Sequence, residues 1–159
     1  MRRVPFVPPD FKVPSGLETD RLRLRMLSVN DVVKDYDAVV TSKERLLRDF
    51  NPGGVWPDGL TLEQNLIDLG WHQKEFQIRR SFAYTVVSLD ETSVLGCLYI
   101  EPTDHPAHDA RVEMWVRESE ADTGLDLHLY EAVKAWIRSD WPFISPGYPI
   151  RETPMEEWK

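Results

Sequence analysis

The sequence of 159 residues has little cysteine and no long apolar run. Its one cysteine, Cys97, cannot form an internal disulfide, so we expect a reducing compartment, with the cytoplasm as the default. No apolar stretch approaches the roughly 18 residues of a membrane span, and no apolar segment follows Arg2 and Arg3 as in a secretory signal. We therefore predict neither membrane association nor secretion.

Positive charge is also scarce, since 19 Lys and Arg residues stand against 27 Asp and Glu residues, for a formal net charge of −8. This balance argues against a general nucleic-acid binder, which needs a basic surface. The length favours one domain. A hydrophobic share of 42% and a charged share of 29% are ordinary for a globular protein.

The most informative stretch runs from Ala110 to Ile144. Apolar and polar residues alternate over 110–117, which predicts a strand with two unlike faces. A polar loop follows over 118–124, and then apolar residues at helical spacing predict a helix over 123–138. The apolar run 141–144 predicts a further strand. This order is a βαβ unit, and ligands of α/β sheets usually bind at its first loop.

The rest of the chain supplies more strands and helices. We predict a strand over 17–26, and three helices that cover 29–40, 43–50 and the residues after Thr61. Ser28 and Thr61 are the expected N-caps. The buried side of the third helix is expected to carry these residues: Leu62, Leu66, Leu69, Gln73 and Phe76. Two strands of a hairpin, 82–89 and 94–101, then lead into the strand at Ala110.

These elements predict an α/β fold with a mixed, mostly antiparallel sheet and helices on both faces. The predicted division is an extended arm over 1–16, a domain over 17–144 and an irregular tail over 145–159 without a further helix. Apolar residues of the arm either anchor it to the domain or leave it as a loosely ordered terminus.

Three segments carry a resemblance to a known family. Residues 17–25 read Leu-Glu-Thr-Asp-Arg-Leu-Arg-Leu-Arg, residues 94–100 read Val-Leu-Gly-Cys-Leu-Tyr-Ile, and residues 113–116 read Glu-Met-Trp-Val. They resemble strands of the GNAT superfamily of acyl-CoA-dependent N-acyltransferases, in its ribosomal-protein alanine acetyltransferase-like branch. The resemblance covers roughly residues 17–144.

The resemblance implies an acetyl-CoA cosubstrate and an amine acceptor, either a small molecule or a peptide. The pantetheine arm would lie between two splayed strands, and the pyrophosphate would lie at the N-terminus of the following helix. On this alignment the cofactor-binding residues are Met114, Val116, Asp122, Thr123, Gly124, Leu125 and Asp126. Glu113 is the candidate base, and Trp56 lies in the expected acceptor loop.

The chain departs from the family pattern in its phosphate loop. Only Gly124 matches the family's glycines, and the loop carries four carboxylates: Glu118, Glu120, Asp122 and Asp126. Like charges oppose a pyrophosphate, and Asp122 also has a reading as a plain helix N-cap. The residues after Ile144 are too few for the family's last helix and final two strands. The alternative function is therefore a GNAT-like binding or interaction module that has lost CoA binding and catalysis.

Other readings stay open beside the functional ones. For Glu113 the alternative is a solvated or arginine-paired residue of the strand. For Trp56 the alternative is a residue of the core. The histidines of the segment 104–109 read as a polar turn or, less favourably, as zinc ligands, so no metal is predicted. The remaining patterned tryptophans read as core: Trp71, Trp115, Trp136 and Trp141. The sheet edge left open near Ile144 predicts either a covering tail or a homodimer.

Overall fold

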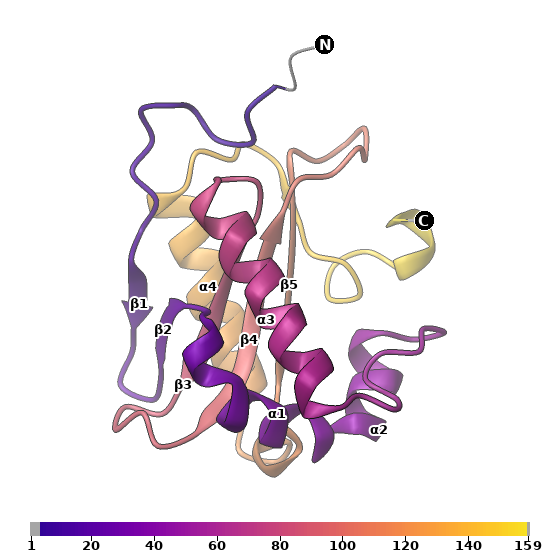
Figure 1. Ribbon diagram of the computed structural model, residues 1–159. Coiled ribbons are helices and arrows are strands. Elements are labelled where there is room, and N and C mark those ends of the chain that lie inside the picture. The colour runs from indigo at the N-terminus through magenta and orange to yellow at the C-terminus, as the bar shows by residue number, and fades with distance from the viewer. Residues whose placement is uncertain (1–3, 159) are drawn as a thin grey trace.

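A six-stranded sheet forms the centre of the computed structural model, which describes residues 4–158 (Figure 1). The strands follow one another across the sheet in chain order, and all neighbours are antiparallel except β5 and β6, which are parallel. The strands are β1 Gly16–Glu18, β2 Arg23–Met26, β3 Phe82–Val87, β4 Val94–Glu101, β5 Ala110–Val116 and β6 Pro146–Gly147. The predicted fold class, a mixed and mostly antiparallel sheet, is confirmed.

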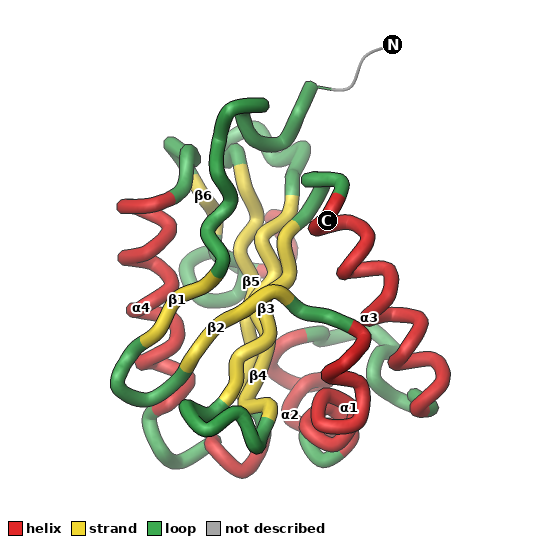
Figure 2. The backbone as a smooth tube through the Cα atoms, turned by 60° about the vertical axis from the view of Figure 1, so that its left-hand side comes forward, coloured by secondary structure: helices red, strands yellow, loops and turns green. Residues whose placement is uncertain are grey.

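Helices cover both faces of this sheet (Figure 2). The α-helices are α1 Val32–Val40, α2 Lys43–Arg45, α3 Leu62–Gln77 and α4 Leu125–Asp140. Short helices of other pitch are η1 Val29–Asp31, η2 Leu46–Phe50, η3 Glu118–Glu120 and η4 Met155–Trp158. Helix α4 lies on one face, and α1, α2 and α3 lie on the other (Figure 2). The short helix η4 corrects the prediction of a tail without a further helix.

The core has two parts because the strands alternate their side chains between the two faces. In β5, Val112, Met114 and Val116 point toward α4, whereas Trp115 joins the cluster beneath α1 and α3. The predicted meander of β3, β4 and β5 is confirmed, and Glu113 pairs with Tyr99 of β4 in its register. Cys97 is fully buried and behaves as a small hydrophobic residue, and burial raises the pKa of its thiol.

The predicted strand over 17–26 is wrong as a single element. The segment folds into the hairpin of β1 and β2, in which Gly16 pairs with Arg25 and Glu18 pairs with Arg23. The turn forms because the Thr19 hydroxyl accepts hydrogen bonds from the backbone N–H groups of Arg21 and Leu22. Hydrogen bonds from the following peptide groups to a side chain reverse the chain direction here, at a point where the apolar alternation alone predicts one continuous strand.

The predicted strand at 141–144 is also wrong, although the parallel βαβ arrangement is confirmed. The pairing with β5 falls at Pro146 and Gly147, which lie opposite Ala110 and Arg111. Asp109 causes the shift, because its carboxylate accepts hydrogen bonds from the backbone N–H groups of Ile144 and Ser145 and bends the chain there. The tail from Ser145 therefore covers part of the sheet edge, as predicted.

The arm before β1 is anchored to the core over residues 6–13. Val7 is buried, and Phe6, Phe11 and Val13 pack against the cluster that α4 covers. Phe6 stacks on Phe143 with a centroid distance of 5.1 Å. Residues 1–3 of the predicted arm and Lys159 of the predicted tail lie outside the described residues.

Helix α3 begins as predicted but exposes more apolar surface than its pattern suggests. Thr61 accepts a hydrogen bond from the Gln64 backbone N–H, which confirms the cap. Leu69 is buried, but Leu62, Leu66 and Trp71 are largely exposed, so their prediction as buried residues is wrong. The buried stripe of the helix is therefore narrower than predicted, and it consists of Asn65, Leu69 and Glu75. Among residues 4–158 no helix has the length and apolarity to cross a membrane.

Candidate functional site

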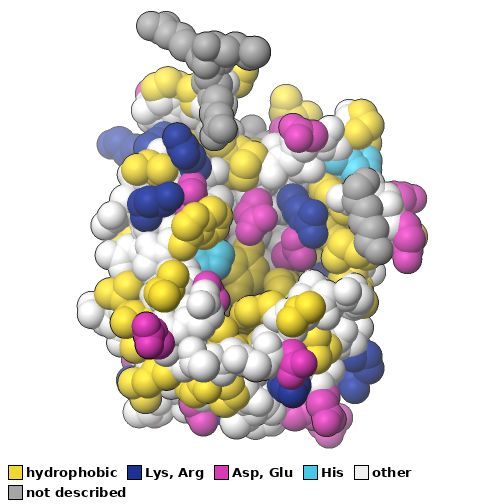
Figure 3. All heavy atoms as spheres, turned by 45° about the vertical axis from the view of Figure 1, so that its right-hand side comes forward, with side chains coloured by type: hydrophobic (Ala, Val, Ile, Leu, Met, Phe, Trp, Pro, Cys, Tyr) yellow, Lys and Arg dark blue, Asp and Glu magenta, His cyan; other side chains and the backbone are white. Residues whose placement is uncertain are grey.

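Two hollows lie beside β5 and meet at two residues. The first, here called the β5 cleft, has a volume of about 360 Å³ and is lined by Arg45, Leu46, Arg48, Asp49, Phe50, Pro52, Glu113, Met114, Trp115, Val116, Asp126, Pro149, Ile150 and Arg151. The second, here called the aromatic cavity, has a volume of about 340 Å³ and is lined by Leu27, Asp35, Val39, Phe50, Trp56, Asn65, Asp68, Leu69, Trp71, His72, Tyr99, Glu101 and Glu113. Phe50 and Glu113 belong to both. Figure 3 shows a hollow near the middle of one face, with hydrophobic side chains inside it and acidic side chains and a histidine around it.

The β5 cleft exists because β5 and β6 part after two residues. In an antiparallel strand, every second residue directs its backbone N–H and C=O groups toward the same neighbouring strand. The Arg117 N–H bonds to the Leu95 carbonyl of β4. Met114 and Val116 therefore present their peptide groups away from β4, toward the cleft. Both carbonyl oxygens accept hydrogen bonds from guanidinium groups: Arg151 donates to Met114 at 3.2 Å, and Arg45 donates to Val116 at 3.3 Å.

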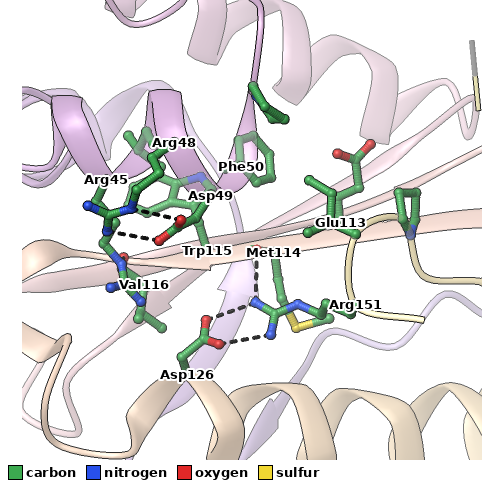
Figure 4. Close-up of a pocket in the computed structure, with 14 residues that line it drawn as sticks. Arg45, Arg48, Asp49, Phe50, Glu113, Met114, Trp115, Val116, Asp126 and Arg151 are labelled. Carbon is green, nitrogen blue, oxygen red and sulfur yellow. Dashed lines mark hydrogen bonds and ion pairs between the residues drawn. The ribbon is translucent and has the colours of Figure 1, made fainter. Parts of the chain in front are cut away.

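Arg151 enters the cleft from the tail and also pairs with Asp126 of α4. Two guanidinium nitrogens of Arg151 each lie 2.8 Å from a carboxylate oxygen of Asp126 (Figure 4). This bidentate geometry is the strong form of an arginine–carboxylate pair. The charge of Asp126, predicted to oppose a pyrophosphate, is therefore balanced within the chain.

The predicted phosphate loop is only partly at the cleft. Of the seven predicted cofactor-binding residues, Met114, Val116 and Asp126 line it, and Asp122, Thr123, Gly124 and Leu125 do not. Leu125 is buried in the core. The carbonyl of Thr123 accepts a hydrogen bond from Arg21, a residue of the turn between β1 and β2.

Gly124, and not Asp122, is the N-cap of α4. It adopts the left-handed conformation with φ of 78°, which glycine reaches at little cost. The reading of Asp122 as the cap is wrong, because the Thr123 hydroxyl accepts the first helical N–H, that of Leu125, instead. The helix still directs its positive dipole end toward this loop.

Aromatic rings form the walls of the second hollow. Phe50 lies 6.1 Å from Trp56 and 5.8 Å from Tyr99 between ring centroids, and His72 lies 5.3 Å from Tyr99. The loop that carries Trp56 is held by the Asn51 side chain, which donates a hydrogen bond to the Trp56 carbonyl at 2.9 Å. Trp56 is thus placed at the wall of a cavity, where the sequence allowed either a role in the acceptor loop or a place in the core.

Carboxylates reach this cavity from the helices on one side and from the sheet on the other. Asp35 of α1 is only 4% exposed and accepts a hydrogen bond from Asn65 of α3 at 3.0 Å. Burial raises the pKa of Asp35 to about 6, and the negative charges of Asp31 and Asp68 add to the shift. Burial also raises the pKa of Glu101 on β4, with a further contribution from Glu113, and burial lowers the pKa of His72, which favours its neutral form.

Glu113 occupies the boundary between the two hollows. Its side chain leaves β5 on the side opposite to Asp126 (Figure 4). It forms an ion pair with Arg111, two residues earlier on the same strand. This pair confirms the alternative from the sequence that Glu113 has an arginine partner. The pairing is compatible with a role in the site, because the same carboxylate lines both hollows.

The other predicted candidates have structural partners. His105 and His108 pack against the Trp158 ring at 4.7 and 5.0 Å, and no group of three potential metal ligands occurs among residues 4–158. Arg23 and Arg25 both pair with Glu91, and Arg25 also pairs with Asp31, so carboxylates balance the charge of this strand face. His128 shares a hydrogen bond with the hydroxyl of Thr19.

Functional residues of the two hollows that were not singled out from the sequence include Asp35, Asn65, Asp68, Glu101 and Arg151. A usable signal exists for Asp35, which follows Val32 by three residues and precedes Val39 by four, so it shares their helical face. An aspartate at a buried helical position is uncommon and marks a candidate site. No comparable local signal exists for Arg151.

The comparisons with known proteins place this arrangement in a known fold. No protein-family model matches the chain, and the curated proteins give no sequence match. Among solved structures, the ribosomal-protein-S5-alanine acetyltransferase from Vibrio fischeri superposes with a TM-score of 0.63 and 16% identity, over 78% of this chain and 67% of that one. The fold is that of the GNAT acetyltransferases.

Two further GNAT structures are similar and hold a CoA ligand. The microcin C7 self-immunity acetyltransferase MccE, in complex with acetyl-CoA and AMP, has a TM-score of 0.62 and 14% identity, over 80% of this chain and 69% of that one. RimL, a ribosomal L7/L12 alpha-N-protein acetyltransferase in complex with coenzyme A, has a TM-score of 0.61 and 18% identity, over 80% of this chain and 68% of that one. The GNAT fold expected from the strand motifs is confirmed, and this chain spans about two thirds of each of the three structures.

Proposed function

We propose that this GNAT-fold chain transfers an acetyl group from acetyl-CoA to an amine held in the aromatic cavity. One observation carries the proposal: Glu113 and Phe50 line both the β5 cleft and the aromatic cavity. A thioester in the first hollow and an amine in the second would meet at this boundary. Bringing two reactants together in this way is itself a large part of catalysis.

Glu113 is the proposed base in this reaction. The neutral amine gives up a proton to the Glu113 carboxylate as its nitrogen forms a bond to the acetyl carbonyl carbon, and the carbon–sulfur bond breaks so that CoA leaves as a thiolate. The thiolate takes up a proton from water, and Glu113 returns its proton to water. Glu113 is already held in place by Arg111. The aromatic walls formed by Phe50, Trp56 and Tyr99 would limit water near the thioester.

The residues of the cleft fit the pantetheine part of acetyl-CoA, on one condition. Met114 and Val116 face the cleft with their peptide groups, as the splayed strands of this fold require. The Met114 carbonyl is, however, bonded to Arg151, so binding needs that side chain to move. The guanidinium group of Arg45 supplies positive charge in the cleft for phosphate groups, whereas that of Arg48 is already paired with Asp49 at 2.9 Å.

The second candidate function is a GNAT-like module that binds an amine or another protein without acetyl transfer. The observation that favours it is the same contact of Arg151 with the Met114 carbonyl and Asp126, because it fills the cleft from within the chain. Four of the seven predicted cofactor-binding residues lie outside the cleft, which also favours this alternative.

Two measurements on the purified protein decide between the candidates. Acetyl-CoA at 100 times its dissociation constant should stabilise the fold by about 2.7 kcal/mol, which a thermal melt detects. Release of free thiol from acetyl-CoA in the presence of amines then reports acetyl transfer. No stabilisation and no thiol release would reject the enzyme and favour the binding module.

A homodimer and a cytoplasmic location stay proposals from the sequence. The outer side of β6 ends the sheet among residues 4–158, which leaves an edge for a second copy. Sedimentation velocity at several protein concentrations tests the dimer.

A further inference from the structure

We propose that the aromatic cavity selects an acceptor with two positive charges, a linear diamine whose reacting amine lies at Glu113 and whose second ammonium lies between Asp35 and Asp68. The proposal rests on the proposed function for the identity of the reacting amine, but the binding that it predicts does not require acetyl transfer. The cavity volume of about 340 Å³ is within the range of small-molecule sites.

The charge of the cavity is the first observation. Four carboxylates line it, those of Asp35, Asp68, Glu101 and Glu113, and within residues 4–158 no lysine or arginine does. Arg111 balances Glu113 from outside the lining. The remaining negative charge makes a cation the favoured occupant, with an attraction that weakens as salt is added.

Asp35 is the second observation, because no positive charge compensates its burial among the described residues. The residue is 4% exposed, it lines the cavity, and its hydrogen-bond partner Asn65 is neutral. Among the described residues it forms no ion pair with a lysine, arginine or histidine. A buried carboxylate without a cation is costly to fold, so its presence at a cavity wall points to a countercharge that arrives with the ligand.

The carboxylates line the cavity from two sets of elements, which is why two charges are proposed. Asp35 and Asp68 come from α1 and α3, and Glu101 and Glu113 come from β4 and β5. One ammonium can therefore be held at the helices while a second amine is at the sheet.

The walls between the two pairs suit an alkyl chain that joins two amines. Phe50, Trp56, Tyr99 and the ring of His72 offer apolar surface for methylene groups. Aromatic faces also attract ammonium groups directly. A neutral diol of the same length would keep the apolar contacts and lose the charge interactions, which makes it a matched control ligand.

Calorimetric titration of the full chain tests the proposal without acetyl-CoA. The probes are 1,4-diaminobutane, 1-aminobutane and 1,4-butanediol at low salt. We expect the diamine to bind at least about tenfold more tightly than the monoamine, and the diol to show no binding. A diamine that binds no better than the monoamine, or not at all, overturns the proposal.

Two variants locate the second ammonium. Asp68→Asn and Asp35→Asn should each reduce the preference for the diamine to less than about threefold. Glu131→Gln removes one charge from an exposed position of α4, away from the cavity, and should leave the preference unchanged. Asp68 is half-buried, so its variant tests the same ammonium position with little change to the core. An equal effect of Glu131→Gln and Asp68→Asn overturns the proposal.

Acetyl transfer separates this proposal from the proposed function. Diamine binding without thiol release from acetyl-CoA supports the diamine site and rejects the enzyme. Thiol release with monoamines and diamines at equal kcat/KM supports the enzyme and overturns the diamine site.

Discussion

Arg151 and Asp126 form a bidentate ion pair across the β5 cleft, with both nitrogen–oxygen distances at 2.8 Å. The pair joins the tail to the first turn of α4, and the same guanidinium donates to the carbonyl of Met114. It neutralises a carboxylate that the sequence suggested would repel a pyrophosphate. It also places a side chain where the pantetheine arm would bond to β5.

Removing this pair should therefore improve the binding of CoA. In the double variant Asp126→Asn/Arg151→Met the Met114 carbonyl loses its donor, and no unpaired charge remains. The ion pair is partly exposed, so breaking it to admit CoA costs about 0.2–1 kcal/mol. Without the pair, the affinity for CoA should rise by up to about fivefold. Calorimetric titration with CoA measures this. Arg80→Met, at an exposed position outside the cleft, is the control. Equal affinities of wild type and double variant would mean that the pair does not compete.

Glu113→Gln should lower kcat for acetyl transfer by about 10²- to 10⁴-fold, the usual contribution of a positioned base. The glutamine retains an oxygen for Arg111, so the melting temperature should change little. The measurement is the rate of thiol release at saturating amine. Glu118→Gln removes a charge from an exposed residue outside both hollows and should leave kcat unchanged. If Glu113→Gln keeps the wild-type rate, another group must accept the proton.

Asp35 should make the fold less stable as the pH rises. Its pKa is about 6 in the folded state and 3.8 ordinarily, so the folded state holds more protons between about pH 4 and pH 6. The free energy of unfolding therefore falls across this interval, and the loss is complete above it, at about 3 kcal/mol.

Asp35→Asn should abolish this loss. The variant should match the wild type near pH 4 and exceed its free energy of unfolding by about 1–3 kcal/mol near pH 8. Urea unfolding at the two pH values measures the difference, with Glu131→Gln as a control that removes an exposed charge. If the free energy of unfolding of the wild type does not fall between about pH 4 and pH 6, Asp35 is not buried in its charged form.

Gly96 and Gly70 should respond to alanine in opposite directions. A Cβ at Gly96 would lie 2.0 Å from the backbone oxygen of Trp115, so β4 and β5 would have to separate, at a cost of about 1–3 kcal/mol or more. A Cβ at Gly70 meets only a Val29 methyl group at 3.7 Å, and alanine there should gain up to about 1 kcal/mol of helix stability. Chemical denaturation of both variants measures the difference. Stabilisation by Gly96→Ala would contradict the observed strand spacing.

Elements with strong local periodicity were predictable. The aromatic and β-branched residues that begin at Phe82 locate β3, and the alternation after Ala110 gives both faces of β5, since each signal depends on neighbouring residues only. The caps at Ser28 and Thr61 follow from side-chain chemistry within three positions. These local signals were sufficient for the GNAT-like order of elements.

The errors come from contacts between distant residues. Pro146 and Gly147 have poor strand propensity, and their pairing is imposed by Asp109, about 35 residues earlier. Of the candidate site, the sequence located Glu113 and Trp56, which line the same cavity. It did not locate Asp35, whose partner Asn65 lies on another helix, or Arg151, whose partner Asp126 is 25 positions away.

The packing of Phe11 on Trp141 has a consequence for synthesis on the ribosome. Their ring centroids are 5.5 Å apart, yet Trp141 is translated 130 residues after Phe11. At bacterial to eukaryotic elongation rates this is a delay of roughly 7–26 s. During that time the emerging chain carries exposed aromatic side chains near its start. A chaperone that binds apolar segments would find its target among residues 6–13 of the nascent chain.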